Sequence, residues 1–183
     1  MKKLEANIIA RVTPAFGTRL TGVKYHPLRD ECNVSEIGEA DFYIGGEICL
    51  AFDGRIILYL SWEENAGWPS HFSVVVSSSS RWKQGTLVEY DASRVPLWRD
   101  VIGKRLDSAE CLGWETTPHV LKFTFGDQTR YIGSSYKTRF GDGDDVFFCD
   151  AKSNPDLNGA TTIWRSEIKA NHGSHAIGAS ASS

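Results

Sequence analysis

Four closely spaced aspartates give this chain its densest set of potential metal ligands. Hard cations such as Ca²⁺ take several oxygen ligands, and aspartates in a glycine-rich loop can supply them. However, the segment Gly141-Asp142-Gly143-Asp144 does not match the Asp-x-Asp-x-Asp-Gly loop, and no glutamate occupies its bidentate position. Glycine and aspartate also form ordinary turns. We therefore expect a solvated turn between two strands and no bound metal, with a metal site as the alternative. The residues concerned are Asp142, Asp144, Asp145 and Asp150.

Carboxylates and tryptophans occur together in a second segment, and this combination suits a binding surface. An exposed tryptophan beside carboxylates can anchor another protein or stack against a sugar. Trp68 precedes a proline outside any strand pattern, so we expect it to be exposed, with packing over a sheet edge as the alternative. Trp82 poses the same question between two basic neighbours. The candidate binding residues are Glu63, Glu64, Trp68 and Trp82, together with the aspartates Asp142, Asp144 and Asp145.

Cysteine and histidine are spread along the chain without a catalytic or metal-binding motif. No Cys-x-x-Cys pair is present, which argues against a zinc site or a redox dithiol. The four cysteines, Cys32, Cys49, Cys111 and Cys149, are enough to form two disulfides. Cys49 and Cys149, however, lie in apolar strand patterns, where a buried free thiol is the commoner state. The sequence therefore predicts no catalytic residue and no cofactor.

The chain has 183 residues, enough for one domain with a sizeable core and appended segments. The net charge of −3, with basic runs no longer than Lys2-Lys3, gives no electrostatic case for binding nucleic acid or an anionic membrane. No stretch approaches the roughly 20 apolar residues of a membrane helix. Glu5, Asn7 and Arg11 interrupt the N-terminal segment, unlike a secretory signal. We therefore expect a cytoplasmic protein, and the sequence leaves its oligomeric state open.

The clearest structural pattern lies in residues 42–62, where apolar residues alternate on either side of an Asp-Gly pair. Successive strand residues point to opposite faces, so this pattern predicts a long hairpin with one apolar face. A three-residue loop, 53–55, places Phe52 opposite Ile56 and keeps that face dry, whereas a two-residue turn would not. The alternating residues are Phe42, Ile44, Gly46, Ile48, Leu50 and Phe52, then Ile56, Leu58, Leu60 and Trp62.

Residues 93–102 carry an apolar stripe at helical spacing that includes Trp98, which we expect in the core. Ser93 can cap this helix, Pro96 is tolerated in its first turn, and Gly103 fits the position after its end. Alternation elsewhere predicts further short strands. They span residues 4–12, 19–25, 71–76, 86–90, 109–114, 120–125, 129–134 and 145–149.

The pattern divides the chain into three parts. Residues 1–150 form a single mainly β domain, and residues 151–171 form a C-terminal extension with a short helix over 162–170. Residues 172–183 are rich in serine, alanine and glycine and are predicted to be a disordered tail.

Hairpin connections and polar–apolar alternation favour antiparallel strands over a parallel α/β fold. The predicted fold is therefore mainly β (α+β): a bent antiparallel sheet, a sandwich or an open barrel, with one helix packed on it. The core residues expected to be buried together are Leu50, Phe52, Leu58, Leu60, Leu121 and Phe123.

Three apolar segments give the chain a layout that resembles a known group of proteins. They are Phe-x-Ile-Gly-Gly-x-Ile-x-Leu-x-Phe from Phe42, Trp98-Arg-Asp-Val-Ile-Gly103 and Leu121-Lys-Phe-Thr-Phe125. In this layout, residues 42–150 resemble the small β-rich bacterial immunity proteins of polymorphic toxin systems. The resemblance implies a compact intracellular domain that occludes a toxin. It rests on layout alone and carries over no functional residue.

Two functional hypotheses follow from the sequence. The first is a non-enzymatic domain that binds another protein through its acidic loops, in the manner of an immunity protein. The alternative is a small enzyme or ligand-binding β-barrel that uses the acidic loop 142–150 or an aromatic-lined pocket. A deep pocket with converging polar groups would favour the alternative, whereas an acidic, aromatic surface would favour protein binding.

Overall fold

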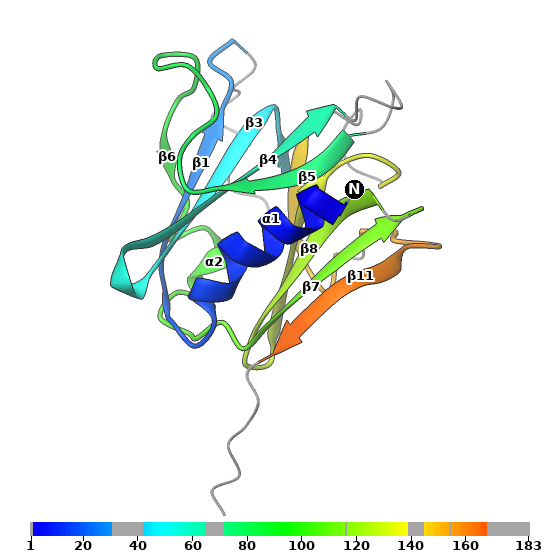
Figure 1. Cartoon of the computed structure of the whole chain (residues 1–183). Helices are drawn as coiled ribbons and strands as arrows, with labels where there is room; N and C mark the ends of the chain where they lie inside the picture. The colour runs from blue at the N-terminus through cyan, green and yellow to red at the C-terminus, as the bar shows by residue number, and fades with distance from the viewer. Residues whose placement is uncertain are drawn as a thin grey trace, which may run out of the picture.

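The computed structural model describes residues 2–30, 42–64, 72–115, 117–138, 145–153 and 155–167, which form two antiparallel sheets that face each other (Figure 1). The prediction of a mainly β, antiparallel fold is thereby confirmed. The two sheets stack as a sandwich, and the apolar faces of both contribute to one hydrophobic core.

The first sheet contains five strands in the spatial order β5-β4-β3-β1-β6. Every pair of neighbours in it runs antiparallel. The strands are β1 (Leu20–Pro27), β3 (Gly46–Phe52), β4 (Ile56–Glu64), β5 (Phe72–Ser77) and β6 (Tyr90–Asp91).

The second sheet contains six strands in the order β11-β7-β8-β9-β10-β2. They are β2 (Phe42–Ile44), β7 (Ser108–Trp114), β8 (Thr117–Phe125), β9 (Gln128–Ser134), β10 (Val146–Asp150) and β11 (Thr161–Glu167). The structure confirms the strands predicted in residues 109–114, 120–125, 129–134 and 145–149, with ends that differ from the prediction by at most three residues.

The predicted hairpin forms with the predicted register. A 3₁₀ turn, Asp53–Arg55, joins β3 to β4 and places Phe52 opposite Ile56. Gly54 and Arg55 both have positive φ, of 74° and 66°, and glycine adopts that conformation without steric cost. The three-residue loop therefore keeps the alternating apolar residues on a single face, and all six predicted core residues are buried in one cluster.

The first strand of that hairpin is shorter than its alternation indicated. Phe42 and Ile44 belong to β2 in the second sheet, where Ile44 lies opposite Val146. The chain changes sheets at Gly46, whose φ is +148°. A Cβ there would lie 2.2 Å from the backbone oxygen of His26. Only glycine fits this corner, so one continuous alternation conceals two strands.

The prediction of a strand over residues 4–12 was wrong, because this segment forms the helix α1 (Lys2–Val12). Ile8 and Val12 are one helical turn apart and both are buried, while Ala6 faces solvent. The same sequence thus satisfies a strand pattern and a helical one. A 3₁₀ turn, Thr13–Ala15, follows the helix.

The predicted helix over residues 93–102 is much shorter than expected. Only α2 (Pro96–Arg99) is helical, followed by turns. Ser93 does not cap it, since its hydroxyl accepts a hydrogen bond from the Val23 N–H at 3.1 Å. A contact with β1 has replaced the expected local cap.

Burial of Trp98 is confirmed, and its surroundings show what α2 does. The Trp98 indole donates a 2.6 Å hydrogen bond to the Tyr25 hydroxyl of β1 in the first sheet. The buried Arg130 of β9, in the second sheet, donates from Nε to the Leu97 carbonyl. The short helix therefore ties the two sheets together.

Helix α1 packs against β5, and in Figure 1 it crosses the front of the sandwich between β5 and β7. Its buried face joins the same hydrophobic core. In the described part of the chain, neither α-helix combines the length and apolar character needed to cross a membrane.

The prediction of a short helix over residues 162–170 was wrong, because β11 occupies Thr161–Glu167 and pairs with β7. A register shift between Thr162 and Trp164 marks a bulge, so the adjacent apolar residues Ile163 and Trp164 are both half-buried. The bulge removes the alternation by which a strand is recognised. Residues 168–183, including the predicted tail, lie outside the described residues.

The connection between β5 and β6 crosses the outer face of the first sheet. These two strands are at opposite edges, so the chain between them, residues 78–89, must pass over the sheet. We call this segment the strap. It contains most of the strand predicted at 86–90, of which Leu87 keeps only an isolated bridge to Leu28.

Candidate functional site

A pocket of about 310 Å³ lies where β4 ends beside the strap. Its walls combine two indoles with three charged groups and a hydroxyl. It is lined by Ser61, Trp62, Glu63 and Glu64 of β4 and by Arg81 and Trp82 of the strap.

The two indoles of the pocket meet edge to face. The ring centroids of Trp62 and Trp82 are 6.5 Å apart at an interplanar angle of 74°. Trp62 also packs edge-on against Phe72 of β5, with centroids 5.1 Å apart. Such arrangements are favoured by the ring quadrupoles. One wall of the pocket is therefore anchored in the sheet and the other belongs to the strap.

Charge in the pocket is only partly neutralised. The Arg81 guanidinium donates to Glu63 Oε2 at 3.0 Å and to the Trp62 carbonyl at 3.4 Å. Glu64 is exposed, and among the described residues it has no ion-pair partner. The pocket thus keeps one carboxylate that is available to a ligand.

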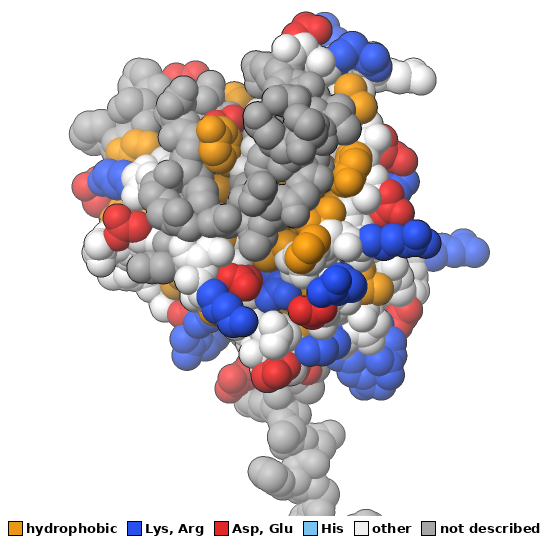
Figure 2. All heavy atoms as spheres, turned by 180° about the vertical axis from the view of Figure 1, so that it is seen from behind, with side chains coloured by type: hydrophobic (Ala, Val, Ile, Leu, Met, Phe, Trp, Pro, Cys, Tyr) orange, Lys and Arg blue, Asp and Glu red, His pale blue; other side chains and the backbone are white. Residues whose placement is uncertain are grey.

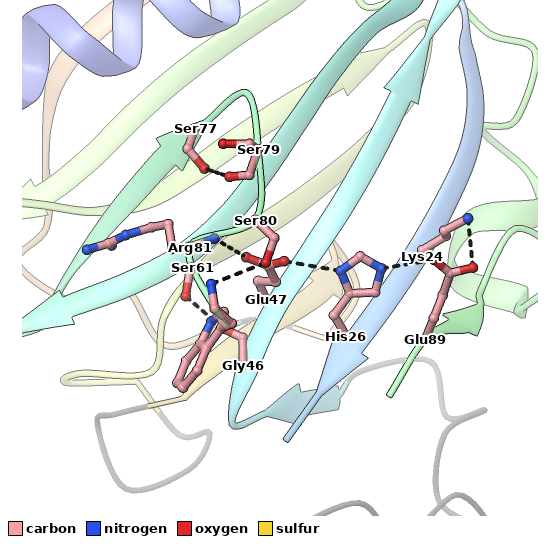
Figure 3. A network of polar contacts seen from close by, with 11 residues as sticks. Lys24, His26, Gly46, Glu47, Ser61, Ser77, Ser79, Ser80, Arg81 and Glu89 are labelled. Carbon is pink, nitrogen blue, oxygen red and sulfur yellow. Dashed lines mark hydrogen bonds and ion pairs between the residues drawn. The ribbon is translucent and has the colours of Figure 1, made fainter. Parts of the chain in front are cut away.

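Beneath the strap, Glu47 is completely buried on the outer face of β3 (Figure 3). It lies between Gly46 and Ile48, and Ile48 points into the core, so the Glu47 side chain points outward toward the strap. Its Oε2 accepts a 3.4 Å hydrogen bond from the backbone N–H of Arg81. Its Oε1 lies 3.2 Å from His26 Nδ1. This carboxylate therefore links the strap to β1.

The polar contacts continue from His26 to the far edge of the sheet (Figure 3). Its Nε2 lies 3.7 Å from Glu89 Oε2, and Glu89 also accepts a 2.8 Å hydrogen bond from Lys24. Hydrogen bonding to Lys24 holds the pKa of Glu89 below its usual value. Both ends of the strap, at Arg81 and at Glu89, are thus bound to the sheet by charged side chains.

Cys49 and His26 are on neighbouring strands of the first sheet, so a pair in which the thiol acts as a nucleophile beside the imidazole has to be considered. Cys49 lies on the same face of β3 as Glu47, and Glu47 is opposite His26. Burial raises the pKa of the Cys49 thiol to about 11, and that of Cys111 to about 12. A nucleophilic cysteine needs a lowered pKa. Cys49, Cys111 and Cys149 are buried free thiols, as predicted for Cys49 and Cys149.

The second sheet carries its own polar cluster around Glu110 of β7, away from the pocket. Its carboxylate accepts hydrogen bonds from Thr162 and Arg165 of β11, the latter at 2.8 Å, and lies 3.3 Å from Lys122 Nζ of β8. Burial raises the Glu110 pKa, but these hydrogen bonds and the charge of Lys122 outweigh it, so the pKa is lowered. This cluster fastens β11 to the sheet.

Three of the sequence-predicted binding residues, Glu63, Glu64 and Trp82, meet in the pocket. Asp145 does not join them: it lies just before β10 and exchanges hydrogen bonds with Ser135. Trp68, Asp142 and Asp144 lie outside the described residues. Within the described ranges, no three His, Cys, Asp or Glu side chains gather in a way that would hold a metal ion.

Arg81 and Trp62 were not among the predicted binding residues, although they are neighbours in sequence of Trp82 and Glu63, and Glu47 was not predicted as the anchor of the strap. Trp62 was assigned to the dry face of the hairpin, which is correct but incomplete, since it also reaches the pocket. Glu47 occupies the strand face that alternation assigns to solvent. Only the strap buries it, and nothing in a local pattern reveals that connection.

On the face of the molecule seen in Figure 2, acidic and basic side chains are interspersed with hydrophobic ones over the described surface. That part of the face shows no extended area of a single charge.

No family model, curated protein or solved structure matches this chain. The assignment of function therefore depends on the chemistry of the pocket.

Proposed function

We propose that this chain is a non-enzymatic protein-binding domain that engages its partner at the pocket formed by the end of β4 and the strap. The observation that supports this best is the meeting of Trp62, Trp82 and Glu64 in one small pocket. Tryptophan is enriched among the residues that dominate binding energy at protein interfaces. A carboxylate beside it supplies charge selectivity.

The position of the pocket also suits protein binding. Four of its lining residues are consecutive on β4, so the sheet fixes their spacing. The strap residues are fixed in turn through Glu47 and Glu63. A preorganised surface loses less conformational entropy when a partner binds.

An enzyme is less well supported by the same observations. Among the described residues, the pocket lining includes no histidine or cysteine, and the raised thiol pKa of Cys49 argues against nucleophilic catalysis beside it. The acidic and aromatic lining matches the surface expected of the protein-binding hypothesis.

Within this proposal, the protein acts in the cytoplasm and its partner is a toxin, as for an immunity protein. Three buried free thiols support a reducing compartment. The toxin partner rests on the resemblance in layout described above. Both parts are open to the same experiment.

Affinity capture of the full chain from cells that carry its gene, followed by mass spectrometry, tests this proposal. Glu64→Lys combined with Trp82→Ala should abolish capture of the specific partner. Glu167→Lys is the matched control, because Glu167 is also an exposed glutamate at the last position of a strand, on the second sheet. The partner should then bind the purified wild type and control, but not the pocket variant. Equal binding by all three proteins would refute the pocket as the binding surface.

A further inference from the structure

We infer that the pocket binds a cationic side chain, a lysine or an arginine presented by the partner. For the partner's identity this inference rests on the proposed function, but the ligand chemistry can be tested on its own.

The charge balance of the pocket is the first argument. The described part of its lining holds two carboxylates, on Glu63 and Glu64, and one guanidinium, on Arg81. Because Arg81 is paired with Glu63 at 3.0 Å, the unneutralised charge resides on Glu64. A cation entering the pocket would gain a partner, whereas an anion would be repelled by Glu64.

The aromatic walls are the second argument. Trp62 and Trp82 are nearly perpendicular, at 74°, so they present surfaces in two different directions. A cation over the face of tryptophan is attracted by the ring quadrupole, and tryptophan is the best of the aromatic residues in this respect. The methylene stem of lysine or arginine would lie against the same indoles.

Pocket size is the third argument. A volume of about 310 Å³ is at the small end of the range for small-molecule sites. It accommodates one long side chain rather than an extended peptide segment. The rest of the partner would then contact the rim around the pocket.

The strap keeps the site from collapsing when it is empty. Arg81 is held through both its backbone and its side chain, by Glu47 and by Glu63. The backbone N–H of Trp82 donates to the Ser80 hydroxyl at 3.2 Å. Arg81 therefore has fixed partners and does not fill the space that a second cation would occupy beside Glu64.

The test uses N-acetyl-arginine amide and N-acetyl-lysine amide as probes of the ¹⁵N-labelled full chain. N-acetyl-citrulline amide is the neutral control, since it has nearly the shape of arginine without the charge. We expect saturable NMR shifts of the Trp62 and Trp82 indole N–H signals with at least one cationic probe. The neutral probe should bind about 2- to 30-fold more weakly, the range expected from loss of a cation–π contact.

Variants identify the groups responsible. Glu64→Gln and Trp82→Leu should each weaken binding of the cationic probe several-fold, whereas Trp82→Phe should retain most of it. Glu167→Gln should leave the affinity unchanged. Equal binding of citrulline and arginine, absence of saturable shifts at both indoles, or equal affinities for Glu64→Gln and wild type would overturn the inference.

The two proposals fail in different ways. If the cationic probes bind as expected but partner capture does not depend on Glu64 and Trp82, the pocket is a cation site and the proposed function is wrong. If partner capture depends on the pocket but the probes do not discriminate by charge, protein binding stands and the cationic ligand is wrong.

Discussion

Glu47 is buried only because the strap, which is distant from it in the sequence, covers it. A glutamate on the outer face of a strand is normally solvated. Here the strap removes it from water, and its two oxygens contact the Arg81 N–H and His26. Burial of a charged or polar group is tolerated when its hydrogen bonds are satisfied. The residue therefore fixes the strap, and through it one wall of the pocket.

Glu47→Ala should lower the free energy of unfolding by about 1–3 kcal/mol, because it leaves buried donors without an acceptor. Glu47→Gln should cost less, since an amide oxygen can still accept from the Arg81 N–H. Urea denaturation measures both values. Glu167→Ala is the control, because that side chain is exposed at the end of β11 on the other sheet and should contribute little to stability. Equal losses of unfolding free energy at positions 47 and 167 would mean that the buried contacts of Glu47 do not stabilise the fold.

Cys111 makes a prediction about alkaline pH. Burial raises its pKa from 9.0 to about 12, so the unfolded thiol loses its proton at a lower pH than the folded one. Its contribution to stability is therefore complete below about pH 9 and is lost as the pH rises toward 12. The free energy of unfolding, measured in urea, should fall between about pH 8 and about pH 10.5. This fall should be smaller by about 2 kcal/mol in Cys111→Ala than in wild type.

The matched control for that comparison is Ile57→Ala, an exposed position with no thiol. Its pH dependence should equal that of the wild type. If Cys111→Ala shows the wild-type pH dependence as well, the thiol titrates alike in both states, and the raised pKa is wrong.

At the scale of elements, Gly46 decides where one strand ends and another begins. Gly46→Ala should lower the free energy of unfolding by about 3 kcal/mol or more, because its Cβ would lie 2.2 Å from the His26 backbone oxygen at a φ of +148°. Gly54→Ala, at a φ of +74° with no atom within 4 Å of the added Cβ, should cost only about 1 kcal/mol. Similar midpoints for the two variants in urea would contradict a sterically closed corner.

The attachment of β11 to the second sheet should weaken at low pH. Because its hydrogen bonds to Thr162 and Arg165 and the charge of Lys122 outweigh burial, the Glu110 pKa is lowered from 4.5. A lowered pKa stabilises the fold above that value, and the contribution is lost as the pH falls below it. Between about pH 5 and about pH 3, Glu110→Gln should therefore lose less stability than wild type. Glu167→Gln should behave as the wild type, and a shared profile for all three proteins would exclude the contribution of Glu110.

Elements were predictable from sequence where one face of a strand is dry and its neighbour is close in the chain. The β3–β4 register followed from the pairing of Phe52 with Ile56 alone. Prediction failed where the deciding contact is remote. Arg165 reaches Glu110 across 55 residues, and the Ser93 hydroxyl meets Val23 across 70. A local pattern in β11 or near α2 contains neither contact.

The candidate site shows the same division. Glu63, Glu64 and Trp82 were recognisable as carboxylates and an indole outside the core pattern. That they would meet depends on the strap folding back over β4, which brings Arg81 to Glu63 across 18 residues. Residue type therefore indicates the chemistry of this site, and topology determines which residues share it.

At the scale of the whole molecule, both sheets contribute to a single core. Leu58 of the first sheet and Phe123 of the second belong to one buried cluster. Leu58→Ala and Phe123→Ala should each lower the free energy of unfolding by about 2–5 kcal/mol, and both proteins should still unfold in one transition. Circular dichroism and tryptophan fluorescence in urea measure this.

Ile57→Ala is the control for the core, since Ile57 neighbours Leu58 on the opposite face and is 39% exposed. Its effect should be below about 1 kcal/mol. Two separate transitions in either core variant would mean that the sheets are independent units.

The pairing of β2 with β10 has a consequence for how the chain is made. Val146 lies opposite Ile44 but follows it by 102 residues. At a synthesis rate of about 5–20 residues per second, β2 waits roughly 5 to 20 s before its partner has left the ribosome. The first sheet can assemble once β6 has been made. The second sheet must form later, and until then β2 has no partner strand. The second sheet is therefore complete only after β10 and β11 have been made, and until then β2 is an unpaired strand open to pairing with other chains.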